Sequence, residues 1–94
     1  EGRAAVIYFV QDGGTLAIKI GYAGDDAEAR MAALQTGNPS PLTLLAVMPG
    51  DRSLESELHR RFAAHRVAGE WFRPAAEILH FIIATVRIGA AGRQ

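Results

Sequence analysis

The 94-residue chain has no cysteine and no excess of charge of either sign. Without cysteine it can form neither disulfides nor cysteine-ligated zinc sites, which favours a reducing compartment and predicts a cytoplasmic location. Ten lysine and arginine residues balance ten aspartate and glutamate residues, whereas strong nucleic-acid binders usually carry a basic excess. The balance counts against a high-affinity DNA module but suits an enzyme that holds its substrate weakly. The basic residues are nevertheless uneven, with a cluster at 60–73.

The chain also lacks an apolar run long enough to cross a bilayer. The longest such segment, AAEILHFIIATV at 75–86, falls short of the ~20 residues that a spanning helix needs. No basic segment followed by an apolar run marks a signal peptide. The length predicts one compact domain over residues 1–94, with its core at 5–88 and flexible ends at 1–3 and 89–94. Such ends are typical of a domain cut from a longer protein.

The apolar pattern predicts an α+β fold, a small three-stranded antiparallel sheet flanked by helices, in the order β-β-α-β-α-α. Strands at 5–11 and 16–20 enclose Asp12-Gly13-Gly14, which is a hairpin signal because tight turns need positive φ. A third strand is expected at 42–48. Its nearly continuous apolar character predicts a central or covered position in the sheet.

Alternation in the second strand separates its two faces. Leu16, Ile18 and Ile20 are expected to point toward one face, and Lys19 toward the other.

The first helix is expected to begin at Asp25, with Glu28 completing a capping box. Its core-facing residues are Ala27, Met31 and Leu34.

The second helix is expected to be capped by Asp51 or Ser53. Its buried ridge is Leu54, Leu58 and Phe62. The segment VAGEWF then turns the chain at Gly69, and a last helix begins at Pro74. The β-branched residues of this last segment leave a strand as an alternative.

Five polar residues could meet in this scheme: Tyr8, Lys19, Arg30, Glu55 and His59. Glu55 and His59 are four residues apart and share a helix face. The set has the components that phosphodiester hydrolysis needs. A carboxylate can hold one hard divalent cation, a cationic side chain can neutralise charge on the phosphate, and a tyrosine or histidine can take a proton from water.

Each of these residues also has an ordinary structural explanation. Tyr8 could be a core tyrosine with a tethered hydroxyl, and Lys19 a solvated strand lysine. Arg30 could pair with a carboxylate one turn earlier on its helix. Glu55 and His59 could be an exposed pair on a plain amphipathic helix.

Beyond these arguments, the chain resembles the GIY-YIG nuclease superfamily. VIY at 6–8 and KIG at 19–21 look like its paired motifs, and Arg30 and Glu55 follow in its order. The fuller pattern, with LQTGNP and then LHRRF and GEWF, is similar to a compact branch found in short bacterial and phage proteins. The resemblance covers residues 5–73.

The resemblance implies metal-dependent hydrolysis of DNA phosphodiesters. By position, Tyr8 matches a general base or water-positioning residue, Arg30 a phosphate contact, and Glu55 the ligand of a single Mg²⁺ or Mn²⁺. Gly21 matches the second motif's glycine, while Lys19 stands in place of that motif's tyrosine.

The sequence-based hypothesis is therefore a metal-dependent endonuclease acting on DNA or RNA. In it, Lys19 helps to stabilise charge on the phosphate, and His59 assists the base. The residues expected to bind the substrate are Gly21, Tyr22, Arg60 and Arg66.

Two other classes stay open. One is a non-catalytic nucleic-acid-binding module that keeps the phosphate pocket. The other is an interaction domain, in which apolar residues of 78–86 form a homodimer or meet an additional domain.

Overall fold

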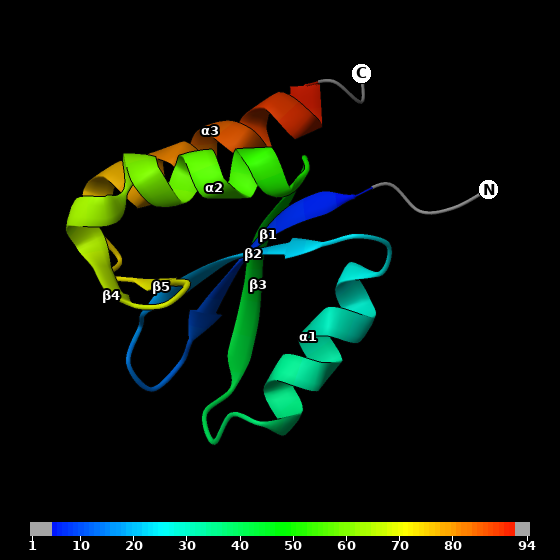
Figure 1. Ribbon diagram of the computed structural model, residues 1–94, viewed down its shortest axis with the longest axis vertical. Coiled ribbons are helices and arrows are strands. Elements are labelled where there is room, and N and C mark those ends of the chain that lie inside the picture. The colour runs from blue at the N-terminus through cyan, green and yellow to red at the C-terminus, as the bar shows by residue number, and fades with distance from the viewer. Residues whose placement is uncertain (1–4, 92–94) are drawn as a thin grey trace.

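The computed structural model describes residues 5–91, in which an antiparallel sheet separates one helix from a pair of helices (Figure 1). The sheet has five strands in the order β3-β1-β2-β5-β4. The elements, in chain order, are β1 (Val6–Asp12), β2 (Ile18–Ala23), α1 (Ala27–Thr36), β3 (Leu42–Pro49), α2 (Arg52–Arg61), a short 3₁₀ turn (Ala63–His65), β4 (Arg66–Ala68), β5 (Trp71–Phe72) and α3 (Ala76–Ala91). The ends 1–3 and 92–94, predicted to be flexible, lie outside the described residues, and α3 continues past the expected core limit of 88.

The prediction of a three-stranded sheet in the order β-β-α-β-α-α was wrong. The segment read as a turn forms β4 and β5, which pair with each other around Gly69 at φ 56°. β5 also pairs with β2, where Ile18 faces Phe72 and Lys19 faces Trp71. Strands of two and three residues are too short to show an alternating pattern, so the sequence gives no periodic signal for them.

The predicted central position of the third strand was also wrong. β3 pairs only with β1 and forms an edge of the sheet. Leu44 and Val47 are 42% and 41% exposed. The central strand of this half is β1, which lies between β3 and β2 and is buried on both faces.

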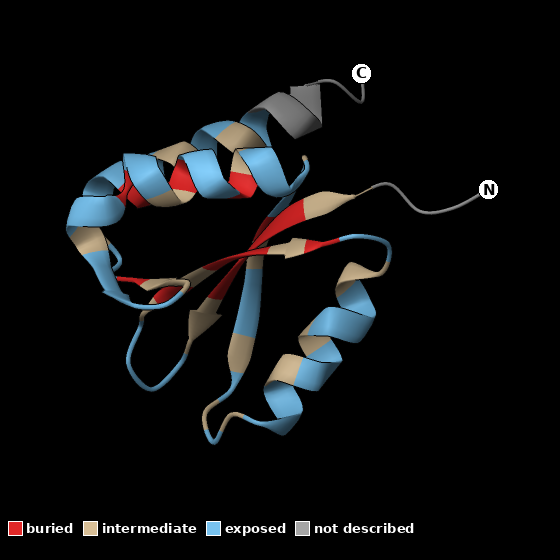
Figure 2. Cartoon of the chain, viewed as in Figure 1, coloured by how far each residue is buried: buried red, intermediate tan, exposed pale blue. Residues whose placement is uncertain are grey.

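Two hydrophobic cores cover the two faces of the sheet (Figure 2). Alternation along β1 sends Ile7 and Phe9 to the core beneath α2 and α3, and Tyr8 and Val10 to the core beneath α1. The expected stripe of α1 packs on the second core through Ala27, Met31 and Leu34. The fold is thus a three-layer arrangement, in which opposite faces of one strand serve different helices.

The second strand begins later than predicted. Leu16 lies in the hairpin loop with φ 66° and is 54% exposed. The loop is closed by hydrogen bonds from the Leu16 amide to the Asp12 carbonyl (2.8 Å) and from the Asp12 amide to the Ala17 carbonyl (3.0 Å). Lys19 does lie opposite Ile18 and Ile20, as predicted, because those two isoleucines belong to the core beneath α2 and α3.

Helix caps explain where the first two helices start. Asp26, and not the expected Asp25, caps α1 by accepting a hydrogen bond from the Ala29 amide at 3.1 Å. The predicted cap Asp51 is confirmed at α2, where its carboxylate accepts from the Leu54 amide at 3.0 Å.

The last segment is helical, so its strand alternative was wrong. Ile78 and Ile82 are fully or almost fully buried, and Leu79 and Phe81 pack partly against the same core. Much of the apolar surface of 78–86 is therefore used within the domain, and the structure gives no support to the predicted homodimer or additional domain there. Neither α3 nor any other described helix has the length and apolarity to cross a membrane.

Candidate functional site

Tyr8 and Gly21 face each other across the β1–β2 ladder. A Cβ atom at position 21 would lie 2.5 Å from the Tyr8 hydroxyl and closer still to the ring, so the ring needs a glycine beneath it. The Tyr8 side chain is 1% exposed, and its hydroxyl makes no hydrogen bond within the described residues. The ring packs in the core beneath α1, with its hydroxyl beside Gly21.

Lys19 lies two residues before Gly21 and therefore on the same face of β2. Its ammonium group donates to the Glu70 carboxylate at 2.8 Å. It also lies 5.7 Å from the centre of the Trp71 ring. Lys19 is thus held by the segment that leads into β5.

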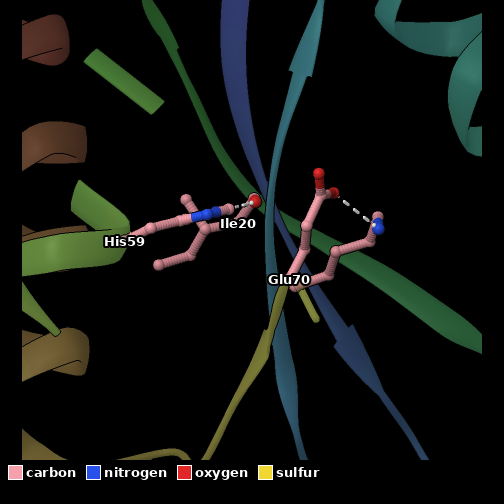
Figure 3. Close-up of polar contacts among 4 residues, drawn as sticks. Ile20, His59 and Glu70 are labelled. Carbon is pink, nitrogen blue, oxygen red and sulfur yellow. Dashed lines mark hydrogen bonds and ion pairs between the residues drawn. The ribbon is translucent and has the colours of Figure 1, made fainter. Parts of the chain in front are cut away.

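His59 approaches β2 from the opposite side. Figure 3 shows its ring on the α2 side of the strand and Glu70 on the other side. Its Nε2 lies 2.8 Å from the Ile20 carbonyl, to which it must donate, and the ring packs against Phe72 at 5.3 Å. The contact joins α2 to the edge of β2 and leaves Nδ1 as the ring's free nitrogen for any role in proton transfer.

Glu55, on α2, and Glu70, just before β5, form an acidic pair, because each carboxyl group shifts the pKa of the other through a hydrogen bond between them. Glu55 is 8% exposed. Burial, followed by the negative charge of Glu70, raises the pKa of Glu55, although the charge of His59 partly opposes this. Burial acts in the same direction on Glu70, but its hydrogen bond and charge interaction with Lys19 outweigh that effect and lower its pKa. Two carboxyl groups with unlike proton affinities therefore lie side by side.

Two neighbouring carboxyl groups could hold a divalent cation. Within the described part of the chain, no group of three histidine or acidic side chains lies together as a metal site. Mg²⁺ commonly takes one or two carboxylates and completes its coordination with water and phosphate oxygens. Glu55 and Glu70 satisfy that smaller requirement, and a cation would relieve the repulsion between them.

Arg30 lies on a hollow of about 670 Å³ between the end of β2 and the starts of α1 and α2. Tyr22 and Arg52 line the same hollow, and the Arg52 guanidinium lies 4.6 Å from the centre of the Tyr22 ring. The charge of Arg52 also acts on Glu55, where it lowers the pKa. Arg52 therefore connects the hollow that contains Arg30 with the acidic pair.

The other two predicted substrate contacts lie apart from each other. Arg60 shares a shallow groove along α2 with Arg52, so a further arginine lies next to the hollow. Arg66 lies on the edge strand β4, with its guanidinium 5.5 Å from the Phe72 ring. The structure therefore groups Arg60, but not Arg66, with the residues around the hollow.

Sequence reasoning missed Glu70 and Arg52. The sequence did contain a signal for Arg52. A positive charge in the first turn of a helix interacts unfavourably with the helix dipole, so an arginine there suggests a functional role. Glu70 lies within GEWF, but its pairing with Lys19, 51 residues away, depends on the unpredicted strand β5.

The Lys19–Glu70 pair predicts a pH-dependent effect of Lys19→Gln on stability. The lowered pKa of Glu70 means that its ionised form stabilises the fold above the usual value of 4.5, and that this stabilisation is lost as the pH falls through the lowered value. We expect the variant to be destabilised at neutral pH by less than ~1 kcal/mol, because the Glu70 side chain is 41% exposed. The difference should vanish in acid.

Urea unfolding of both proteins at about pH 7 and about pH 3 measures this difference. Arg60→Gln, at an exposed position on α2, is the control for loss of a positive charge. An equal destabilisation at both pH values would mean that the ion pair is not its source.

A family model for the T5orf172 domain matches residues 4–87, and no GIY-YIG model matches. The resemblance to the GIY-YIG superfamily was therefore wrong. The two short motifs that suggested the resemblance lie on β1 and β2. Buried strands favour β-branched and aromatic residues in any family, and the Tyr8 ring requires a glycine at position 21, so the fold alone explains these residues. Searches of curated proteins and of solved structures found no match. Because the matched model spans most of the chain, the chain belongs to the T5orf172 domain family.

Proposed function

We propose that this domain binds nucleic acid and hydrolyses a phosphodiester bond at the Glu55–Glu70 pair. The observation that carries the proposal is the placement of a buried glutamate, with a raised pKa, against a second carboxylate. A carboxyl group whose pKa is raised by burial and by a neighbouring like charge is a candidate functional group, and a bound cation would offset the repulsion. Membership of a nuclease-like, DNA-binding family supports the same reading.

The basic residues around the pair account for binding of a phosphate backbone. Arg30 and Arg52 line one hollow, and Arg60 continues from Arg52 along α2. All three are exposed, so their guanidinium groups are free to meet phosphate oxygens, often in bidentate fashion. Asp25 and Asp26 also line the hollow, so its two arginines are accompanied by two acidic residues, and the arginines act as individual phosphate contacts.

The proposed roles follow from the positions of the side chains. Glu55 and Glu70 hold a single Mg²⁺ or Mn²⁺, which when bound supplies charge neutralisation at the phosphate. Lys19 keeps Glu70 ionised and contributes positive charge beside it. The Tyr8 hydroxyl, beside Gly21, is assigned to orient the attacking water or to accept its proton. His59 fixes α2, and with it Glu55, against β2.

Nicking of supercoiled plasmid in Mg²⁺ or Mn²⁺, with a chelator control, tests the proposal. We expect cation-dependent conversion to the open-circular form, together with salt-sensitive binding of DNA or RNA measured by anisotropy. Absence of both binding and cleavage would overturn it.

One observation favours a non-catalytic binding module as the second candidate. The Lys19 ammonium occupies one oxygen of Glu70, and a cation would have to share that carboxylate. Salt-sensitive binding without cleavage in either metal would select this alternative.

Replacing Arg52 tests the proposed phosphate contacts. Arg52→Ala removes one phosphate contact, and we expect the slope of log K against log salt to fall by about one unit, equally for different sequences. Anisotropy titrations at several salt concentrations measure the slope. Arg87→Ala, an exposed arginine on α3, is the matched control and should leave the slope unchanged. The same reduction in both variants would show that Arg52 acts only through net charge.

A further inference from the structure

A second hollow, of about 510 Å³, lies beside Trp71, on the face of the sheet that carries Lys19. It is bounded by the β1–β2 hairpin, by the loop after α1, and by β4 and β5. Its volume is within the range of small-molecule sites. In Figure 1, α1 lies away from β4 and β5, so this part of the face has no helix over it.

We propose that this hollow holds one unpaired nucleobase, stacked on Trp71. The indole is half-buried, and it provides the flat aromatic surface on which bases of any sequence can stack. Val67, which is 59% exposed, and Pro74 add apolar surface to the same hollow.

Polar groups at the rim suit the edge of a base. The Asn38 amide nitrogen donates to the Ser40 carbonyl at 2.8 Å, which leaves its oxygen as an acceptor. Thr15 accepts from the Ala17 amide at 3.2 Å and keeps its hydroxyl proton for donation. Asp12 uses one oxygen for the Gly14 amide at 2.7 Å and retains the other. A donor and acceptors at one rim match the mixed hydrogen-bonding edge of a base.

Through Trp71 the hollow adjoins Lys19 of the proposed site, and the inference rests on that proposed function. Lys19 lies directly opposite Trp71 in the β2–β5 ladder. Its ammonium is 2.8 Å from Glu70 and 5.7 Å from the centre of the Trp71 ring. A phosphate beside Lys19 would therefore have its attached nucleoside within reach of the indole.

Stacking on Trp71 determines the class of substrate. The faces of a paired base are covered by its neighbours in the duplex, so only a single-stranded or extruded base can enter the hollow. Stacking also provides affinity without charge, which agrees with the balance of ten basic and ten acidic residues.

Trp71 is the only tryptophan in the chain, so its fluorescence reports directly on this hollow. In chelator, which prevents cation-dependent cleavage, the protein is titrated with a single-stranded oligonucleotide, with the same phosphodiester backbone lacking bases, and with a fully paired duplex. We expect saturable quenching by the first ligand only. The abasic backbone should bind roughly tenfold more weakly than the complete strand in anisotropy measurements.

Variants separate stacking from folding. Trp71→Ala should weaken binding of the complete strand roughly tenfold while leaving the abasic backbone unaffected, and Trp71→Phe should restore most of the loss. The ligand comparison on the unmodified protein decides the question even if Trp71→Ala fails to fold. Equal binding of both strands without quenching would overturn the inference and leave the proposed function standing. Absence of binding by every ligand would overturn both.

Discussion

Glu55→Gln is expected to reduce cation-dependent nicking by about 10²-fold or more while the domain stays folded. Glutamine keeps the size of the side chain but lacks the negative charge that holds a cation. A bound cation contributes several kcal/mol of charge stabilisation in the transition state, which corresponds to at least that factor. Plasmid nicking rates of the variant and the parent measure the loss.

The same substitution is expected to stabilise the protein at neutral pH. Because the pKa of Glu55 is raised in the folded state, ionisation of this group opposes folding, and stability declines as the pH rises from the usual value of 4.5 through the raised value. Glutamine cannot ionise, so the variant should match the parent in acid and exceed its melting temperature near neutrality. Loss of activity together with gain of stability is typical of residues selected for function.

Thermal unfolding at about pH 4 and about pH 7 provides the second measurement. Glu57→Gln, at an exposed glutamate on the same helix, is the matched control and should change neither the nicking rate nor the melting temperature appreciably. Nicking that persists within a few fold in the Glu55 variant would remove this residue from the proposed role. A lower melting temperature at neutral pH would show that Glu55 is a structural residue.

Gly21→Ala is expected to destabilise the domain by about 1–3 kcal/mol, the usual effect of overpacking. The entropy of the unfolded chain alone predicts a small stabilisation, because alanine has fewer backbone conformations to lose on folding than glycine has. Here the added methyl group would lie 2.5 Å from the Tyr8 hydroxyl, so the ring has to move within a core in which it is 1% exposed. For a domain of this size, each kcal/mol lowers the melting temperature by roughly 4–8 °C.

A double-mutant cycle identifies Tyr8 as the source of the clash. In a Tyr8→Leu background the ring is absent, so the effect of Gly21→Ala should become much smaller than in the parent. Gly37→Ala is the control, because no atom lies within 4 Å of a Cβ built there and its φ is −91°. If Gly21→Ala unfolds at the same temperature as the parent, the close approach of Tyr8 is not maintained in solution.

The elements that depend on neighbouring residues were predictable. The Asp51 cap and the ridge through Leu58 and Phe62 follow from interactions within a few residues. The hairpin was located correctly, but the positive φ expected at its glycines falls at Leu16. The opposite orientations of Lys19 and Ile20 follow from the two-residue period of a strand. Errors at this level were small, such as the cap at Asp26 in place of Asp25.

The candidate site was only partly predictable. The order of Tyr8, Arg30 and Glu55 along the chain suggested chemistry, but the order of residues does not specify which side chain faces which. Glu70 is the second member of the acidic pair, and Arg52 links the pair to the hollow. Their contacts depend on β5 lying beside β2 and on α2 lying beside the end of β2, so the sequence alone did not predict them.

Local patterns in the chain were sufficient for the hairpin, the three helices and the amphipathic faces, since the hydrogen bonds and side-chain periods behind them span only a few residues. The arrangement of five strands, with β3 at the edge and β5 next to β2, was decided by contacts between residues far apart along the chain. Such contacts depend on how the helices and the sheet pack together in the two cores. For that reason the Glu55–Glu70 pair and the hollow beside Trp71 exist only in the folded protein.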